Sequence, residues 1–80
     1  GRMFFNILAT FAEFEADLRD LHALVLALGG VTERQIANAT RAFDRRDDDL
    51  ARRTIDADDE SDRLDEEIHE LCLKILALHL

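Results

Sequence analysis

The chain has 80 residues and a mass of 9.1 kDa, enough for one small domain. Its 18 acidic and 10 basic residues leave a net charge of −8, which argues against nucleic acid and anionic membranes as general partners. An apolar content of 48% is too high for a disordered chain, and no apolar run reaches the ~20 residues of a membrane-spanning helix. The single cysteine, Cys72, cannot form an internal disulfide, which suits the reducing cytosol, so we expect a cytoplasmic protein.

The residue composition indicates an all-α protein. Proline is absent, only three glycines occur, and no stretch alternates apolar and polar residues as a half-buried strand does. Residues 1–3, Gly-Arg-Met, look like a tag remnant, because Met3 is a natural start. We therefore expect one helical domain over residues 4–80.

An apolar stripe with spacings of three and four residues predicts a first helix over about residues 4–43. Gly29 and Gly30 weaken such a helix by ~1 kcal/mol each relative to alanine, but the apolar phase continues past them. We expect one long helix through the pair, and a bend there is the alternative. The stripe, which is the expected contact face, consists of Phe4, Leu8, Phe11, Phe14, Leu18, Leu21, Val25, Leu28, Thr32, Ile36, Ala39 and Phe43.

A turn is expected at residues 46–48, where Asp47 or Asp48 can accept hydrogen bonds from the first N–H groups of the next helix. The helix that follows has an unbroken heptad seam, with gaps that alternate between four and three residues. This seam is small and polar in its first half and apolar in its second. Its members are Leu50, Thr54, Ala57, Ser61, Leu64, Ile68, Leu71, Ile75 and Leu78.

The expected fold is a long antiparallel helical hairpin, and one helix–helix seam buries too little apolar area to stabilise it alone. We therefore expect two chains to pair as a homodimer that forms a four-helix bundle. The expected interface consists of Phe4, Phe5, Phe11, Phe14, Leu64, Ile68, Leu71, Ile75 and Leu78.

The net negative charge lies in residues 44–70, which contain 13 of the 18 acids and five of the 10 bases. Asp58 and Asp62 are four residues apart, so their side chains share one side of a helix and repel each other unless a cation or a basic group lies between them. Oxygen ligands in this arrangement suit Mg, Mn, Ca or ferric iron. The spacing alone is weak evidence for metal, since acidic helices produce it by chance, and a solvated acidic face is the simpler interpretation.

The order of these features resembles the first repeat of the PhoU family, the bacterial phosphate-uptake regulators. The resemblance covers about residues 11–78 in one continuous register. It is carried by Phe11-x-x-Phe14-Glu15-x-x-Leu18, Leu28-Gly29-Gly30, Glu33-x-Gln35-Ile36-x-x-Ala39, Asp47-x-x-Leu50-Ala51-x-x-Thr54-Ile55-x-x-Asp58-x-x-x-Asp62-x-Leu64-x-x-Glu67-Ile68 and Cys72-Leu73-x-Ile75-Leu76-Ala77.

The resemblance implies a protein of three-helix bundles that restrains phosphate uptake. Such proteins contact the phosphate ABC transporter and its sensor histidine kinase, and several bind iron or zinc clusters through E/D-x-x-x-D motifs. Asp58 and Asp62 fall on the first such motif, so the resemblance makes them candidate ligands of an iron or zinc cluster. The third helix with its second acidic motif, and a second repeat, are not among these 80 residues. Ser61 stands where the family has an aliphatic residue.

Two other functions remain open from the residues. Glu66-x-x-His69 has the spacing found in ferritin-like di-iron bundles, which makes a metal-binding four-helix assembly with redox or storage activity the alternative. No second Glu-x-x-His occurs, however. A purely structural oligomerisation module without metal is the other interpretation. No nucleophile–base pair or glycine-rich phosphate loop is present in the sequence, so we expect no enzyme activity.

Overall fold

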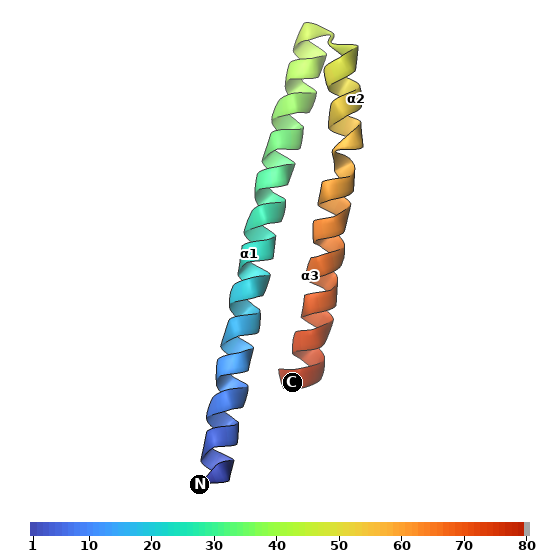
Figure 1. Cartoon of the computed structure of the whole chain (residues 1–80). Coiled ribbons are helices and arrows are strands. Elements are labelled where there is room, and N and C mark those ends of the chain that lie inside the picture. The colour runs from blue at the N-terminus through green and yellow to red at the C-terminus, as the bar shows by residue number, and fades with distance from the viewer. Residues whose placement is uncertain (80) are drawn as a thin grey trace.

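The chain forms a long antiparallel helical hairpin (Figure 1). This computed structural model describes residues 1–79, in which α1 spans Arg2–Arg45, α2 spans Asp48–Asp56 and α3 spans Asp58–His79. The described residues contain helices and no strand, which confirms the all-α prediction and the hairpin. Leu80, the last residue of the expected domain, lies outside them.

The first helix passes through its glycine pair unbroken, as predicted. Residues 29 and 30 are helical like their neighbours, within an α1 of 44 residues. A Cβ added at either glycine would meet nothing within 4 Å. No close neighbour within the hairpin therefore requires glycine at either position.

The turn between the two arms is closed by one residue in the left-handed region and one helix cap. Arg46 has φ 51° and ψ 44°, which lets its N–H donate to the Phe43 carbonyl at 3.3 Å and ends α1. Asp47 follows in an extended conformation, and its side-chain Oδ1 accepts from the Leu50 N–H at 3.0 Å. Of the two aspartates expected to cap the second arm, Asp47 performs this role.

The second arm has an interruption that the heptad pattern did not predict. Ala57 separates α2 from α3, and its carbonyl accepts from the Glu60 N–H at 3.2 Å and from Gln35 Nε2 at 3.4 Å. The two helices nevertheless continue in nearly one direction beside α1 (Figure 1). The break therefore leaves the hairpin geometry intact.

The second arm packs on α1 with the predicted seam. Most of that seam is half-buried or buried, which confirms it, while Ala57 and Leu78 are exposed. Cys72 and His79 also lie at the contact. Ile75 is the most deeply buried residue of α3, with 7% of its surface exposed.

The contact face of α1 differs from the predicted stripe. Only Phe14, Leu21 and Leu28 of that stripe are covered, and its other members are exposed. The seam instead follows one strict heptad line that accepts polar residues. Its members are Phe14, Asp17, Leu21, Leu24, Leu28, Val31, Gln35, Asn38 and Ala42. The prediction of this face was wrong because two adjacent lines of α1 are both apolar, and because Asp17 and Gln35 of the true seam find partners on the second arm.

Candidate interaction surface

One buried polar cluster joins α1 to the end of α3. Asp17 is buried, and its Oδ1 accepts from Lys74 Nζ at 3.2 Å while its Oδ2 lies 3.1 Å from His79 Nε2. The His79 ring is almost fully covered, and its centroid is 5.0 Å from that of Phe14. The cluster fixes the register of the two arms far from the turn.

The hydrogen bonds of this cluster set the charge state of Asp17. The hydrogen bond from His79, followed by that from Lys74, holds the pKa of Asp17 below its ordinary value of 3.8. An ionised carboxylate only accepts, so Nε2 of His79 carries the proton. His79 Nδ1 is then buried with no hydrogen-bond partner among residues 1–79. Asp17 therefore serves as the anionic centre of a structural contact.

The two aspartates predicted as metal ligands lie on the first two turns of α3, where both are exposed. Asp58 and Asp62 share one side of the helix, as their spacing requires. Among residues 1–79, however, no group of three His, Cys, Asp or Glu side chains converges as a metal site. The pair supplies oxygen donors of a suitable kind but not enough of them for a closed coordination sphere.

The residues predicted as a dimer interface fall into two groups in the structure. Phe4, Phe5, Phe11 and Leu78 are exposed. The others lie within the hairpin seam itself, where they are half-buried or, for Ile75, buried: Phe14, Leu64, Ile68, Leu71 and Ile75. Only the first group is free to contact a partner without opening the hairpin.

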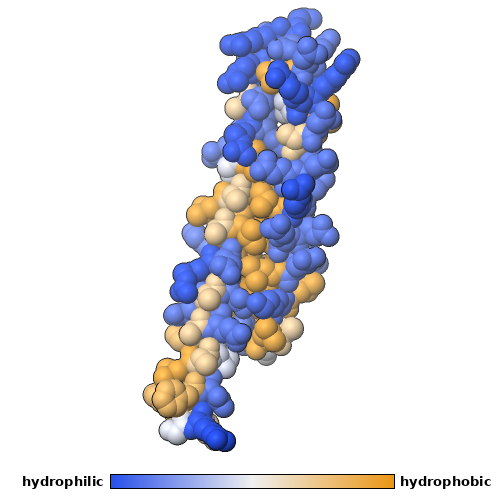
Figure 2. Space-filling view, viewed as in Figure 1, coloured by the Kyte–Doolittle hydropathy of each residue, from blue (hydrophilic) through white to orange (hydrophobic). Residues whose placement is uncertain are grey.

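A second row of apolar side chains runs along α1 beside the seam, and we call it the apolar flank. Figure 2 shows apolar atoms gathered toward the N-terminal end of α1 and along the junction of the two arms. Hydrophilic atoms cover the hairpin end. The members of the flank, all exposed, are Phe4, Leu8, Phe11, Leu18, Val25, Ile36 and Phe43.

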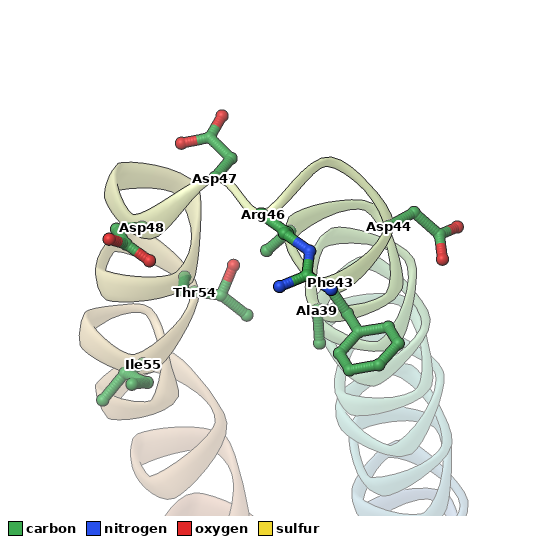
Figure 3. A pocket seen from close by; sticks show the side chains of 10 residues that line it. Ala39, Phe43, Asp44, Arg46, Asp47, Asp48, Thr54 and Ile55 are labelled. Atoms are coloured by element: carbon green, nitrogen blue, oxygen red, sulfur yellow. The ribbon is translucent and has the colours of Figure 1, made fainter.

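At the hairpin end this flank forms one wall of an open groove of about 760 Å³. Ala39 of α1 and Thr54 of α2 lie on the facing sides of the two helices, while the Phe43 and Ile55 side chains lie farther out, on either side of the gap (Figure 3). The Arg46 side chain lies beside Phe43 at the turn (Figure 3). The groove thus combines exposed apolar walls with a charged tip.

The remaining sequence candidates lie farther along α3. Glu66 and His69 are exposed and line a shallow hollow together with Cys72. No facing glutamate from α1 approaches them in the described part of the chain, as a di-iron bundle would require. No helix of residues 1–79 is long and apolar enough to cross a membrane.

Two features escaped the sequence reasoning. Asp17 and His79 were missed because their partners lie 57 or more residues away, so no local pattern marks them. The apolar flank did leave a signal, since Phe4, Phe11, Leu18 and Val25 recur every seven residues. The apolar stripe of α1 contains this line as well as part of the seam, so it is wider than the contact with a single helix requires.

Comparison with known proteins gives a consistent family assignment. The family model described as the PhoU domain matches residues 25–79. The phosphate-specific transport system accessory protein PhoU of Edwardsiella tarda is 35% identical over 68 residues, which is 85% of this chain and 28% of that protein. The protein of the same name from Escherichia coli K12 is 34% identical, and the homolog from Pseudomonas aeruginosa is 35% identical. Each of these two alignments covers 81% of this chain and 27% of the relative.

The chain therefore spans little more than a quarter of the length of these relatives. No solved structure gives a significant match.

Proposed function

This chain belongs to the PhoU family, and we propose that it acts as a PhoU-like regulator of phosphate uptake and phosphate signalling. Its relatives are named as accessory proteins of the phosphate-specific transport system. An accessory role is performed by binding to other proteins rather than by catalysis, so we propose that the chain is not an enzyme.

The observation that carries this proposal is the apolar flank of α1. Phe11, Leu18, Val25 and Ile36 are exposed along one side of a single helix. Monomeric proteins seldom expose contiguous apolar surface of this length unless another protein covers it. The partners we propose are the phosphate ABC transporter and its sensor histidine kinase, contacted on the cytoplasmic side of the membrane.

The test uses a bacterium that lacks its own PhoU gene and measures uptake of radiolabelled phosphate in phosphate-rich medium. Expression of this chain is expected to lower the uptake rate. The double variant Phe11→Ser/Leu18→Ser, which changes the flank only, is expected to lose this effect. Ala27→Ser changes an exposed residue on the opposite side of the seam, one position before Leu28, and should keep it. Unchanged uptake in cells that contain the folded wild-type chain would reject the proposal.

We also propose that two chains pair through the exposed part of the expected interface. The start of α1 extends past the end of α3 (Figure 1), and the exposed Phe4, Phe5 and Phe11 all precede Asp17, which His79 at the end of α3 contacts. Residues 3–12 contain no charged side chain, so two such segments can approach without repulsion. Sedimentation equilibrium is expected to give a dimer, and Phe4→Ser/Phe5→Ser should shift it to monomer. A folded wild-type chain that stays monomeric at all concentrations contradicts the pairing.

A cation-binding role for Asp58 and Asp62 follows from the family resemblance and is a separate proposal. The pair would supply two carboxylates, and a partner molecule or a second chain would supply the remaining donors. Elemental analysis and titration with iron or zinc should separate the wild type from Asp58→Ala/Asp62→Ala. Equal and negligible binding by both proteins rejects the assignment.

A further inference from the structure

α1 carries two candidate contact lines that differ by one position in the chain. The line that packs on the second arm has six apolar residues among its nine members, which were given above as the seam of α1. The line one position later includes much of the apolar flank and has five apolar residues among nine. Its members are Glu15, Leu18, His22, Val25, Gly29, Thr32, Ile36, Ala39 and Phe43. Apolar content alone therefore gives little preference for the observed face.

A rotation of α1 about its own axis would exchange the two lines. Successive residues lie about 100° apart around a helix, so a rotation of this size brings the second line to the contact and keeps the two arms antiparallel. Two packed helices favour discrete arrangements, because ridges of side chains on one helix fill grooves on the other. The two lines therefore define two separate positions of α1 rather than a continuous range.

The polar contacts of the seam distinguish these two positions. The Asp17 side chain is 7% exposed, and it contacts Lys74 Nζ at 3.2 Å and His79 Nε2 at 3.1 Å. A buried carboxylate is costly when it is unpaired and is stabilised by such partners. Gln35, about five helical turns further along the same line, donates to the Ala57 carbonyl at 3.4 Å. Both contacts require this line to face the second arm.

We infer that α1 can pack on the second arm with either line, and that Asp17, paired with Lys74 and His79, keeps it in the observed position. Without these partners an unpaired charge would remain in the seam, whereas a rotation by one position exposes Asp17 to water and brings Leu18 and Val25 to the contact. In the observed position Leu18 is 42% and Val25 50% exposed, so both have apolar surface left to bury. The inference goes beyond the proposed function, since it concerns how the two arms pack and involves no partner.

The test reads the position of α1 from the reactivity of single thiols. Leu24 is half-buried in the seam and Val25 is exposed beside it, so Leu24→Cys and Val25→Cys report on the two lines. Each is made together with Cys72→Ala, which leaves one thiol in each protein. Alkylation is followed by mass spectrometry at low protein concentration. We expect the thiol at position 24 to react about fivefold more slowly than the thiol at position 25.

Removal of the partners of Asp17 should reverse this order. In Lys74→Met/His79→Phe the side chains keep much of their size, and the aromatic contact with Phe14 can remain. We expect the thiol at position 25 to become about threefold slower and the thiol at position 24 to become faster.

Circular dichroism checks that the helices of the double variant are retained. If they are not, His79→Phe alone keeps the Lys74 contact and should narrow the ratio of the two rates. The matched control Arg63→Met/His69→Phe changes two exposed residues of α3 and should alter each rate by less than about twofold.

A compensating substitution separates the charge of Asp17 from other effects of the partner variant. Asp17→Leu, added to Lys74→Met/His79→Phe, removes the carboxylate that needs the partners and places an apolar side chain in the seam. The original order of the two rates is expected to return.

Three results overturn the inference. An unchanged rate at position 25 in the folded partner variant shows that α1 does not rotate. Equal acceleration at positions 24 and 25 shows that the arms separate, so that the contacts of Asp17 serve stability alone. A reversed order that persists after Asp17→Leu assigns the effect to α3 itself. The phosphate-uptake assay is independent of these rates, so failure of the proposed function and failure of this inference can be told apart.

Discussion

Truncation of Ile75 tests where the hairpin is held together. Ile75 has 7% of its surface exposed, so Ile75→Ala removes three buried carbon atoms from the seam. At ~0.8 kcal/mol per buried carbon group the loss is about 2.4 kcal/mol. The better helix propensity of alanine returns a few tenths of a kcal/mol, and an open two-helix structure leaves little cavity. We expect a net loss of about 2 kcal/mol in the free energy of unfolding.

The neighbouring residue provides the matched control. Leu76 is 54% exposed, so Leu76→Ala removes the same number of atoms with about half the burial and should cost about 1 kcal/mol. Urea unfolding followed by circular dichroism measures both losses, at several protein concentrations so that pairing of chains can be separated from folding. If the marginal hairpin does not survive Ile75→Ala, Ile75→Val should still show a loss of about 1 kcal/mol. Equal effects of the two alanine variants at low concentration would refute the observed register of α3.

Three further features of the hairpin can be tested by substitution. Gly29→Ala and Gly30→Ala should each stabilise the chain by about 0.5–1 kcal/mol in urea unfolding, because both sites are helical and open around the added Cβ. A loss of stability would instead show that this part of α1 is covered. Asp47→Ala removes the cap of α2 and should cost about 1 kcal/mol by the same assay, whereas Asp47→Asn should keep most of it. The hydrogen bond from His79 depresses the pKa of Asp17, so its contribution is present above pH 3.8 and is lost as the pH falls through the lower folded value. The stability difference between the wild type and Asp17→Asn should therefore shrink on acidification below that pH, and a constant difference would contradict the contact.

The hairpin itself could be predicted because its signals are local. A heptad line from Leu50 to Ile75 has no competing apolar line beside it, so its phase fixes the inward face of the second arm. The cap at Asp47 follows from side-chain chemistry within one turn of helix. The interruption at Ala57 also had a local signal, since three consecutive acids follow it, as is typical of a first helical turn.

The contact face of α1 could not be predicted because long-range contacts decide it. A search for apolar periodicity omits Asp17 and Gln35, although both lie in the seam. Asp17 is stabilised there by Lys74 and His79, and Gln35 donates to a carbonyl of the second arm. Each partner is at least 22 residues away in the sequence, so the choice between two adjacent apolar lines depends on the fold as a whole.

The uneven charge of the chain separates two kinds of contact surface. The segment over residues 3–12 is uncharged and mostly apolar, so contacts made there depend on the burial of apolar surface. The strength of such contacts changes little, or increases slightly, as the salt concentration increases. The exposed carboxylates of Asp58, Asp62 and Asp65 lie on the part of the hairpin that holds the entire net charge, so attractive contacts made there with a cationic group weaken as salt screens the carboxylates. Contacts at the uncharged end and contacts along the acidic part of the second arm should therefore respond differently to added salt, which distinguishes the two surfaces in any binding measurement.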